Sequence, residues 1–353
     1  MGCVRSGISV LLLTFVAAAA GEQQAAFECN ERGVAAAIRG DFDEAEQDYQ
    51  KALTLWRALG PAYEGHTATT LYNLGQTFVG EGRWLESIPI FQEAVELGRQ
   101  AFSLRHSRTL ATLNTLGRVY MVTGDLDRSA AAFLEALPIE REMFPNGIEL
   151  AQTLGNLAVL RTRQDRLPEA LTLGDEGLAL AIKALGDNVP DTATMYAIVA
   201  AIHQRAGRTE RALPLFRKAH AIYDRTIPPE DLRYVSLLSS EALSLMDDHH
   251  FSEADNQLRR ALQLLSPCAS RCGLALAIAE NNFGLLRMAQ KKYVEADAYL
   301  RSALAHEEQY SAGPGGDMVQ TLKHLAALRE KQHRYEESAA LKQRIAAVQS
   351  SYR

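Results

Sequence analysis

Two short stretches contain residue types that can take part in metal or phosphate chemistry. The sequence DDHH, Asp247 to His250, places two carboxylates beside two imidazoles, which are groups that ligate metals such as zinc. Four adjacent polar residues are also typical of a solvated turn, and we expect a turn here. The stretch SAGPGG at 311–316 lacks the Lys-Ser/Thr pair of a phosphate-binding loop, so we expect it to be a connector.

Common catalytic signatures are missing from the sequence. It contains no Gly-x-Ser-x-Gly, no His-Glu-x-x-His and no Cys-x-x-Cys, which mark a nucleophile elbow, a zinc protease and a redox or zinc-binding pair. We therefore expect no enzymatic activity, no cofactor and no metal.

The cysteines allow one local crosslink. Cys3 lies in an apolar leader and Cys29 stands alone, whereas Cys268 and Cys272 flank a short link that follows Pro267. A link of this length can bring two Cα atoms within disulfide distance. Cys268 and Cys272 are thus predicted either to form a disulfide or to pack as two small apolar side chains.

A repeat of about 42 residues underlies most of the chain. Small residues recur at intervals of 41 or 42: Ala45, Ser87, Ser129, Ala170, Ala212, Ala254, Ala296 and Ser338. A bulky apolar residue usually follows four positions later and another small residue seven positions later. Spacings of three and four residues place these side chains on one face of a helix.

A second set of small residues lies twelve positions before the first set: Gly33, Gly75, Gly117, Ala158, Ala200, Ala242, Gly284 and Ala326. Small residues at matching places on two successive helices let the helices approach closely. Between the two sets stands a Gly or polar residue where a turn is required: Gly40, Gly82, Gly124, Asp165, Gly207, His249, Lys291 and His333. Each unit is therefore predicted to be an antiparallel helix pair, and the protein to be all-α.

The third unit shows the resemblance to a known family most completely. ATLNTLGRVYMVTGDLDRSAAAFLEAL, residues 111–137, carries Leu-Gly, Tyr, small, aromatic and small residues in the order found in tetratricopeptide repeats (TPRs). The 42-residue period resembles the kinesin-light-chain-like variety of that family. The resemblance implies an α-α superhelix of about eight helix-turn-helix repeats over residues 26–348, starting near 26, 68, 110, 151, 193, 235, 277 and 319, with a tail at 349–353. Departures occur at Gly174, Gly177, Glu241 and Lys342.

Polar side chains recur on the side of the first helices that is expected to be concave, which is where the resembling family binds its ligands. They are Asn73, Gln76, Asn114, Arg118, Asn156, Asn281, Asn282, Lys323 and His324. An amide side chain offers both a donor and an acceptor, which suits an extended peptide backbone. Because Asn is a poor helix former, its recurrence in Ala-rich helices favours a binding role over simple solvation. We expect a protein or peptide partner.

Charge argues against nucleic acid as that partner. The chain has 37 basic and 43 acidic residues and a net charge of −6, mixed along its length. It lacks the basic stripe that attracts a phosphate backbone. Two other roles remain open: an architectural protein that assembles through its convex face or its ends, and a sensor or regulatory subunit for an enzyme on another chain.

The first twenty residues are typical of a secretory signal peptide. Arg5 precedes the apolar run ISVLLLTFVAAAA, residues 8–20, which ends in three small alanines. Thirteen apolar residues span about 20 Å as a helix, which is less than the ~30 Å hydrocarbon core of a bilayer. Residues 21–25 are expected to form a short linker. An alternative is a lipid anchor, because Gly2, Cys3 and Ser6 fit acylation patterns.

These features lead to a prediction about processing. We expect export to the periplasm or the exterior, no stable membrane span after cleavage, and a mature chain that starts at Gly21. N-terminal sequencing of the protein made in its native host checks this. An intact chain acylated at Gly2 would instead establish the membrane-anchored alternative.

Overall fold

The computed structural model describes the backbone of residues 3–268, 272–310 and 316–350. Side chains are described from residue 20 onward, except at 269–271, 311–317 and 349–353. Most of the connector predicted at 311–316, most of the tail predicted at 349–353 and the leader side chains therefore lie outside the described residues.

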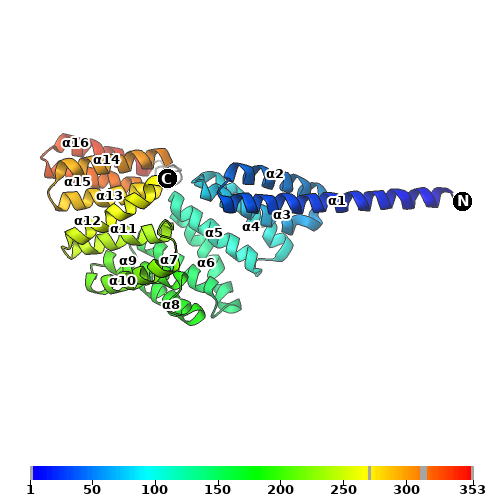
Figure 1. Ribbon diagram of the computed structural model, residues 1–353, viewed down its shortest axis with the longest axis horizontal. Helices are drawn as coiled ribbons and strands as arrows, with labels where there is room; N and C mark the ends of the chain where they lie inside the picture. Colours follow the sequence, from blue (N-terminus) through cyan, green and yellow to red (C-terminus); the bar gives the residue numbers. More distant parts are fainter. Residues whose placement is uncertain (1–2, 269–271, 311–315, 351–353) are drawn as a thin grey trace. The chain divides into compact units, whose positions relative to one another are not determined.

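The described residues form sixteen α-helices and no strand, which confirms the predicted all-α class (Figure 1). The first helices of the successive pairs are α1 (Cys3–Arg39), α3 (Glu64–Gly80), α5 (Ser107–Thr123), α7 (Ile148–Arg163), α9 (Pro190–Arg205), α11 (Leu232–Asp247), α13 (Gly273–Ala289) and α15 (Gly316–Lys331). The second helices are α2 (Phe42–Leu59), α4 (Trp84–Phe102), α6 (Leu126–Met143), α8 (Leu167–Leu185), α10 (Thr209–Thr226), α12 (Phe251–Leu265), α14 (Tyr293–Tyr310) and α16 (Tyr335–Ser350). Two 3₁₀ turns, Pro61–Tyr63 and Ser266–Cys268, lie between pairs.

The chain divides into two compact units, Met1–Val119 and Tyr120–Arg353, with the division inside α5. In the first unit α1 packs on α2 and α3 on α4, and in the second unit α7 to α16 form five further pairs. Successive first helices also contact one another, as α9, α11, α13 and α15 do in the second unit. Residues 21–25, predicted to be a linker, belong to α1, which has no break there.

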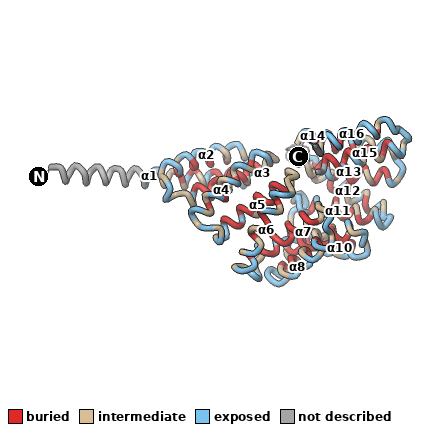
Figure 2. Tube along the Cα trace, turned by 180° about the vertical axis from the view of Figure 1, so that it is seen from behind, coloured by how far each residue is buried: buried red, intermediate tan, exposed pale blue. Residues whose placement is uncertain are grey.

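The two sets of small residues are buried, and Figure 2 shows such buried positions (red) interspersed with exposed ones (pale blue) along the helices. In the second helices, Ala45 through Ala296 of this set have no exposed surface and Ser338 has 2%. A Cβ added to Gly75 would lie 2.7 Å from the Phe91 ring, and one added to Gly284 would lie 2.6 Å from Leu300. In these pairs the large side chain of the second helix thus occupies the space that the glycine of the first helix leaves.

The fourth unit departs from this pattern because the next unit fills its space. Gly174 and Gly177 stand on α8 where a bulky residue and an alanine are usual. A Cβ at Gly174 would meet Ile202 and Val199 of α9, each at 3.2 Å, and one at Gly177 would meet Met195 at 2.7 Å. Side chains of α9 therefore supply the volume that α8 lacks.

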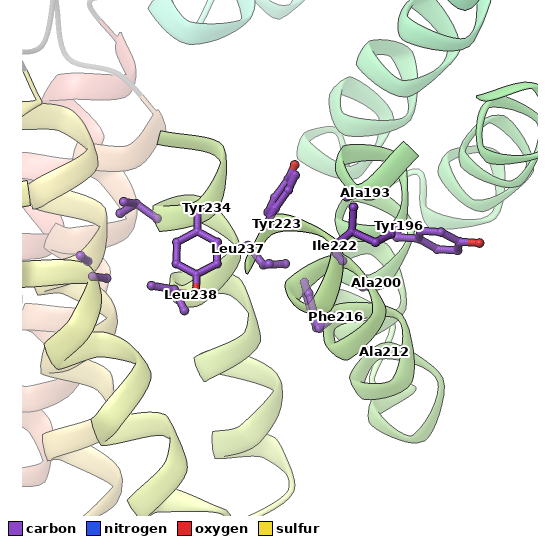
Figure 3. Close-up of a cluster of buried hydrophobic side chains, with 14 of the residues drawn as sticks. Ala193, Tyr196, Ala200, Ala212, Phe216, Ile222, Tyr223, Tyr234, Leu237 and Leu238 are labelled. Carbon is purple, nitrogen blue, oxygen red and sulfur yellow. The ribbon is translucent and has the colours of Figure 1, made fainter. Parts of the chain in front are cut away.

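The fifth and sixth units share a cluster of buried apolar side chains. Figure 3 shows Phe216, Ile222 and Tyr223 of α10 between Ala193 and Ala200 of α9 and Tyr234 and Leu237 of α11. All are at most 1% exposed. The inner side of α10 thus contacts both neighbouring first helices, so each pair is stabilised by the next as well as by itself.

Glu241, which occupies an apolar place in the sixth unit, is buried with polar partners. Its Oε2 lies 3.0 Å from His220 Nδ1 and accepts a hydrogen bond from Gln257 Nε2 at 3.0 Å. The other ring nitrogen of His220 lies 3.1 Å from the Tyr234 hydroxyl, which donates to Asp224 at 2.7 Å. The hydrogen bond to Glu241 is the main cause that raises the pKa of His220 above its ordinary value.

Buried arginines join second helices of successive pairs. The guanidinium of Arg287, three residues after Gly284, lies 2.7 Å from both Asp255 of α12 and Glu295 of α14. Arg329 stands at the equivalent place one unit later and contacts Asp297 of α14 and Glu337 of α16. The arginine side chains are only 4% and 3% exposed. Asp255 and Asp297 are mostly buried as well, whereas Glu295 and Glu337 are about half exposed, so solvent screens the pairs to the aspartates least.

The eight turns all place their predicted residue in the left-handed region, whether or not it is glycine. Gly207 has φ of 68°, and Asp165, His249, Lys291 and His333 have φ between 58° and 61°. After Gly207, the amide of Arg208 donates to the carbonyl of His203 at 2.9 Å, which closes the end of α9. The residues of DDHH are exposed at such a turn, as predicted.

Gly207→Ala is expected to lower the free energy of unfolding by about 1 kcal/mol, because alanine is strained at this φ. A Cβ at Gly207 would meet no atom within 4 Å, so backbone conformation is the only source of the loss. Urea titration followed by circular dichroism measures it. Gly207→Asn is the matched control, because asparagine tolerates the left-handed region, and equal losses for both variants would contradict the explanation.

A second prediction concerns pH. Because the pKa of His220 is raised in the fold, its contribution to stability is fully present below its unfolded pKa of about 6.5 and is lost as pH rises through the folded value. The difference in unfolding free energy between the parent and His220→Gln should fall by about 1–2 kcal/mol between pH 5.5 and pH 8.5. Thermal unfolding across this range measures it, and a difference that does not vary with pH would refute the role of His220.

Candidate functional site

The side of the second unit formed by its first helices contains a groove of about 1060 Å³. We call this the second-unit groove. Helices α9, α11, α13 and α15 form its walls. Its lining residues are Asp165, Gln204, Arg205, Gly207, Thr209, Ser240, Leu243, Met246, Asp247, Ile278, Asn281, Asn282, Leu285, Glu307, Gln320, Thr321 and His324. Polar residues predominate, with an apolar strip of Leu243, Met246, Ile278 and Leu285.

Helical spacing explains why these residues share one side. On α13, Ile278, Asn282 and Leu285 follow one another at four and three residues. On α15, Gln320 and His324 are four residues apart. The small residues of the same helices face the paired second helix. The residues on the neighbouring side of each first helix are therefore the ones that line the groove.

Asn281 and His324, both predicted site residues, meet in the groove. His324 Nδ1 lies 2.9 Å from Asn281 Oδ1. The Thr321 hydroxyl lies 3.3 Å from the same oxygen, but its single proton is donated to Oε1 of Glu307 at 2.8 Å. Burial is the main cause that lowers the pKa of His324 below its ordinary value, and the charge of the adjacent Lys323 lowers it further.

Asn282 also lines the groove but has a structural bond. It is 6% exposed, and its Nδ2 donates to the backbone carbonyl of Ser239 at 3.3 Å. This bond ties α13 to α11. Its neighbour Ile278 is 42% exposed, which is unusual for isoleucine and gives the groove an accessible apolar surface.

The groove is also lined by the cation Arg205 and by three residues that the sequence did not point to, Gln204, Asp247 and Gln320. Gln204 Nε2 donates to Asp247 at 2.9 Å, and Arg205 lies 3.9 Å from Asp165. The polar side of the first helices also contains Gln204, Asp247 and Gln320. Each lies one helical turn beyond the positions of the predicted polar residues. Extending those positions by one turn in each direction would have found them.

Asn73 and Gln76 lie in the first unit and do not line the second-unit groove. Asn73 Nδ2 donates to Asn30 Oδ1 at 3.4 Å, and Gln76 Nε2 donates to the Tyr72 hydroxyl at 2.8 Å. Both residues line a cavity of about 310 Å³ between α1, α2 and α3, and Asn73 also lines one of about 250 Å³ between α3, α4 and α5.

The remaining predicted residues do not line the second-unit groove. Asn114 and Arg118 stand on α5 in the first unit, the first half-buried and the second exposed. Asn156 is half-buried on α7, and Lys323 is exposed on α15. The structure therefore brings together Asn281, Asn282 and His324 out of the nine predicted residues.

Cys268 and Cys272 form a disulfide, with their Cα atoms 5.4 Å apart. Cys272 immediately precedes α13, and its amide donates to the carbonyl of Cys268 at 2.7 Å. The crosslink therefore fixes the start of the helix that carries Asn281 and Asn282. Cys29 is a buried free thiol.

Searches for a metal site and for a membrane span found neither. Across the side chains that the structure describes, no three His, Cys, Asp or Glu residues are grouped so that they could hold a metal ion. In the same part of the chain, no helix is both long enough and apolar enough to cross a bilayer.

A protein-family model described as tetratricopeptide repeat matches residues 22–83, 66–142 and 149–225. No curated protein matches the chain.

Solved structures similar to this one include peptide-bound and apo repeat proteins. A Rap protein complexed with competence and sporulation factor has 14% identity and a TM-score of 0.65, with 94% of this chain and 98% of that chain covered. NprR in complex with its cognate peptide NprX has 16% identity and a TM-score of 0.62, with 89% of this chain and 86% of that chain covered. The apo form of the quorum sensor NprR from B. thuringiensis is also similar. Kinesin light chain TPR-like repeats from Podosopora anserina align at 16% identity over 58% of this chain and 97% of that chain, with a TM-score of 0.47.

Proposed function

Because the chain belongs to the tetratricopeptide-repeat family, whose model matches more than half of it, we propose that it is a non-catalytic interaction scaffold that binds an extended segment of a partner protein. The binding site is the second-unit groove. The architectural role and the regulatory-subunit role are the outcomes that remain if the groove is not the site.

The observation that carries this proposal is the composition of the groove. The groove has a volume of about 1060 Å³, and amide, hydroxyl and imidazole groups line it around an accessible apolar strip. An extended peptide needs a partner for each backbone N–H and C=O that it withdraws from water. It also gains affinity by burying an apolar side chain against residues such as Ile278 and Leu285. The groove offers both kinds of contact along one line of helices.

Two similar structures support the choice of a peptide over a small molecule. NprR is known in complex with its cognate peptide NprX, and the Rap protein is known in complex with competence and sporulation factor. Identities of 16% and 14% support a shared fold, so the ligand itself must be inferred from the groove of this chain.

We further propose that the protein works outside the cytoplasm. The signal-peptide pattern of residues 1–20 supports export. The disulfide between Cys268 and Cys272 agrees with it, since disulfides persist in oxidising compartments.

Gln204→Ala combined with Asn281→Ala should weaken partner binding by about fivefold to 150-fold, because each removes about 0.5–1.5 kcal/mol of neutral hydrogen bonding. Helix content and melting should stay near those of the parent, since alanine is a good helix former. Partners are captured with the tagged parent protein, and the affinity of the strongest is measured by calorimetry.

The matched control is Gln263→Ala combined with Gln309→Ala. These glutamines are exposed on the second helices α12 and α14 and do not line the groove. The control should bind as the parent does. If the control loses binding while the groove variant keeps it, the partner sits on the other face and the architectural role applies.

A further inference from the structure

Asn281 and His324 line the second-unit groove and orient each other there, which gives the pair a defined polarity. Their contact joins α13 to α15 at 2.9 Å, between His324 Nδ1 and Asn281 Oδ1. A carbonyl oxygen can only accept, so Nδ1 must carry the proton in this bond. In the neutral imidazole the other ring nitrogen, Nε2, is then a bare acceptor.

The remaining hydrogen-bonding atoms of the pair are complementary to a peptide unit. Asn281 Oδ1 accepts from His324 Nδ1. Within the residues that the structure describes, neither Asn281 Nδ2 nor His324 Nε2 forms a hydrogen bond, and both residues line the groove. The pair thus offers one donor and one acceptor. A peptide backbone presents the reverse, a C=O that accepts and an N–H that donates.

We propose that Asn281 and His324 bind one peptide unit of the partner segment, and that protonation of His324 releases it. The proposal rests on the function proposed above. In the bound state Asn281 Nδ2 donates to the peptide carbonyl and His324 Nε2 accepts from the peptide N–H. A proton on Nε2 turns the acceptor into a donor, so two N–H groups then face each other and the bond is lost.

The groups around His324 keep the ring neutral at neutral pH. Lys323 is adjacent on α15, and its charge opposes a positive ring. Arg205 of α9 is the other cation that lines the same groove. The carboxylates that line the groove are Glu307 of α14, Asp247 of α11 and Asp165 beyond them. The balance still lowers the pKa of His324 below its ordinary 6.5, with burial as the main cause. Binding should therefore be constant above about pH 6.5 and weaken below it.

The ring state can be tested without any ligand. Nitrogen-15 NMR of histidine-labelled full-length protein distinguishes a protonated ring nitrogen from a bare one, and His324→Gln identifies the signals of His324. We expect a protonated Nδ1 and a bare Nε2 at neutral pH. The opposite tautomer, or a ring already charged at neutral pH, would overturn the proposal.

The binding test uses peptides selected from a random phage-displayed library on the full-length protein at neutral pH. For the parent, affinity should fall threefold to tenfold for the first unit of pH below the pKa of His324, on the scale of about one lost hydrogen bond. His324→Gln should bind within about threefold of the parent and show no such fall, because its amide can accept without titrating. Methylating a backbone nitrogen of the peptide removes its N–H. At the one position whose N–H donates to His324, this change should lower the affinity as much as the pH drop does.

His306→Gln is the control for histidine loss in general. His306 is half-buried on α14, lies 2.8 Å from Glu280 and does not line the groove, so this variant should keep the pH dependence of the parent. If selected peptides bind in the groove but His324→Gln falls with pH as the parent does, only the role of His324 is wrong. If the Gln204→Ala and Asn281→Ala variant binds every selected peptide normally, the groove itself is not the site and both proposals fail.

Discussion

The close approach of two helices at small residues is the contact on which the structure depends. Gly75 against Phe91 and Gly284 against Leu300 leave no room for one more carbon atom. The small residues that allow this contact recur every 41 or 42 residues. Because each helix has only one side that can face its partner, the same contact decides which residues are left for the other sides.

The other sides of the helices make different contacts. One packs on the next pair, as Phe216 and Tyr223 do between α9 and α11. Another lines the second-unit groove, where side chains from α9, α11, α13 and α15 gather although the residues are far apart in sequence. A stacked array can therefore change its groove residues one by one while its packing residues stay in place. Most of the residues that line the groove are therefore distinct from those that pack the helix pairs, although Asn282 does both.

Buried polar groups also form specific ion pairs and hydrogen bonds between successive helix pairs. Arg287 and Arg329 connect second helices on either side of them, and Glu241 connects α10, α11 and α12 through His220 and Gln257. Removing one partner from such a pair leaves a buried charge, which costs more than the pair contributes while intact. These groups therefore favour one register of each pair on the next over neighbouring registers.

The sequence by itself determined the helix pairs, their period, their turns and the residues that pack between them. Those features are local or repeat at a fixed interval, and even the left-handed turn residues Asp165 and Lys291, which are not glycine, follow from their place in the repeat. It also indicated the side of the first helices on which polar residues gather. The tertiary structure alone decided that α9 fills the space beside Gly174, that Asn73 and Asn281 belong to different units, and that Asn281 Oδ1 faces His324. These outcomes depend on which atoms of separate helices come within a few ångströms of one another, and no periodic pattern in a single sequence contains that distance.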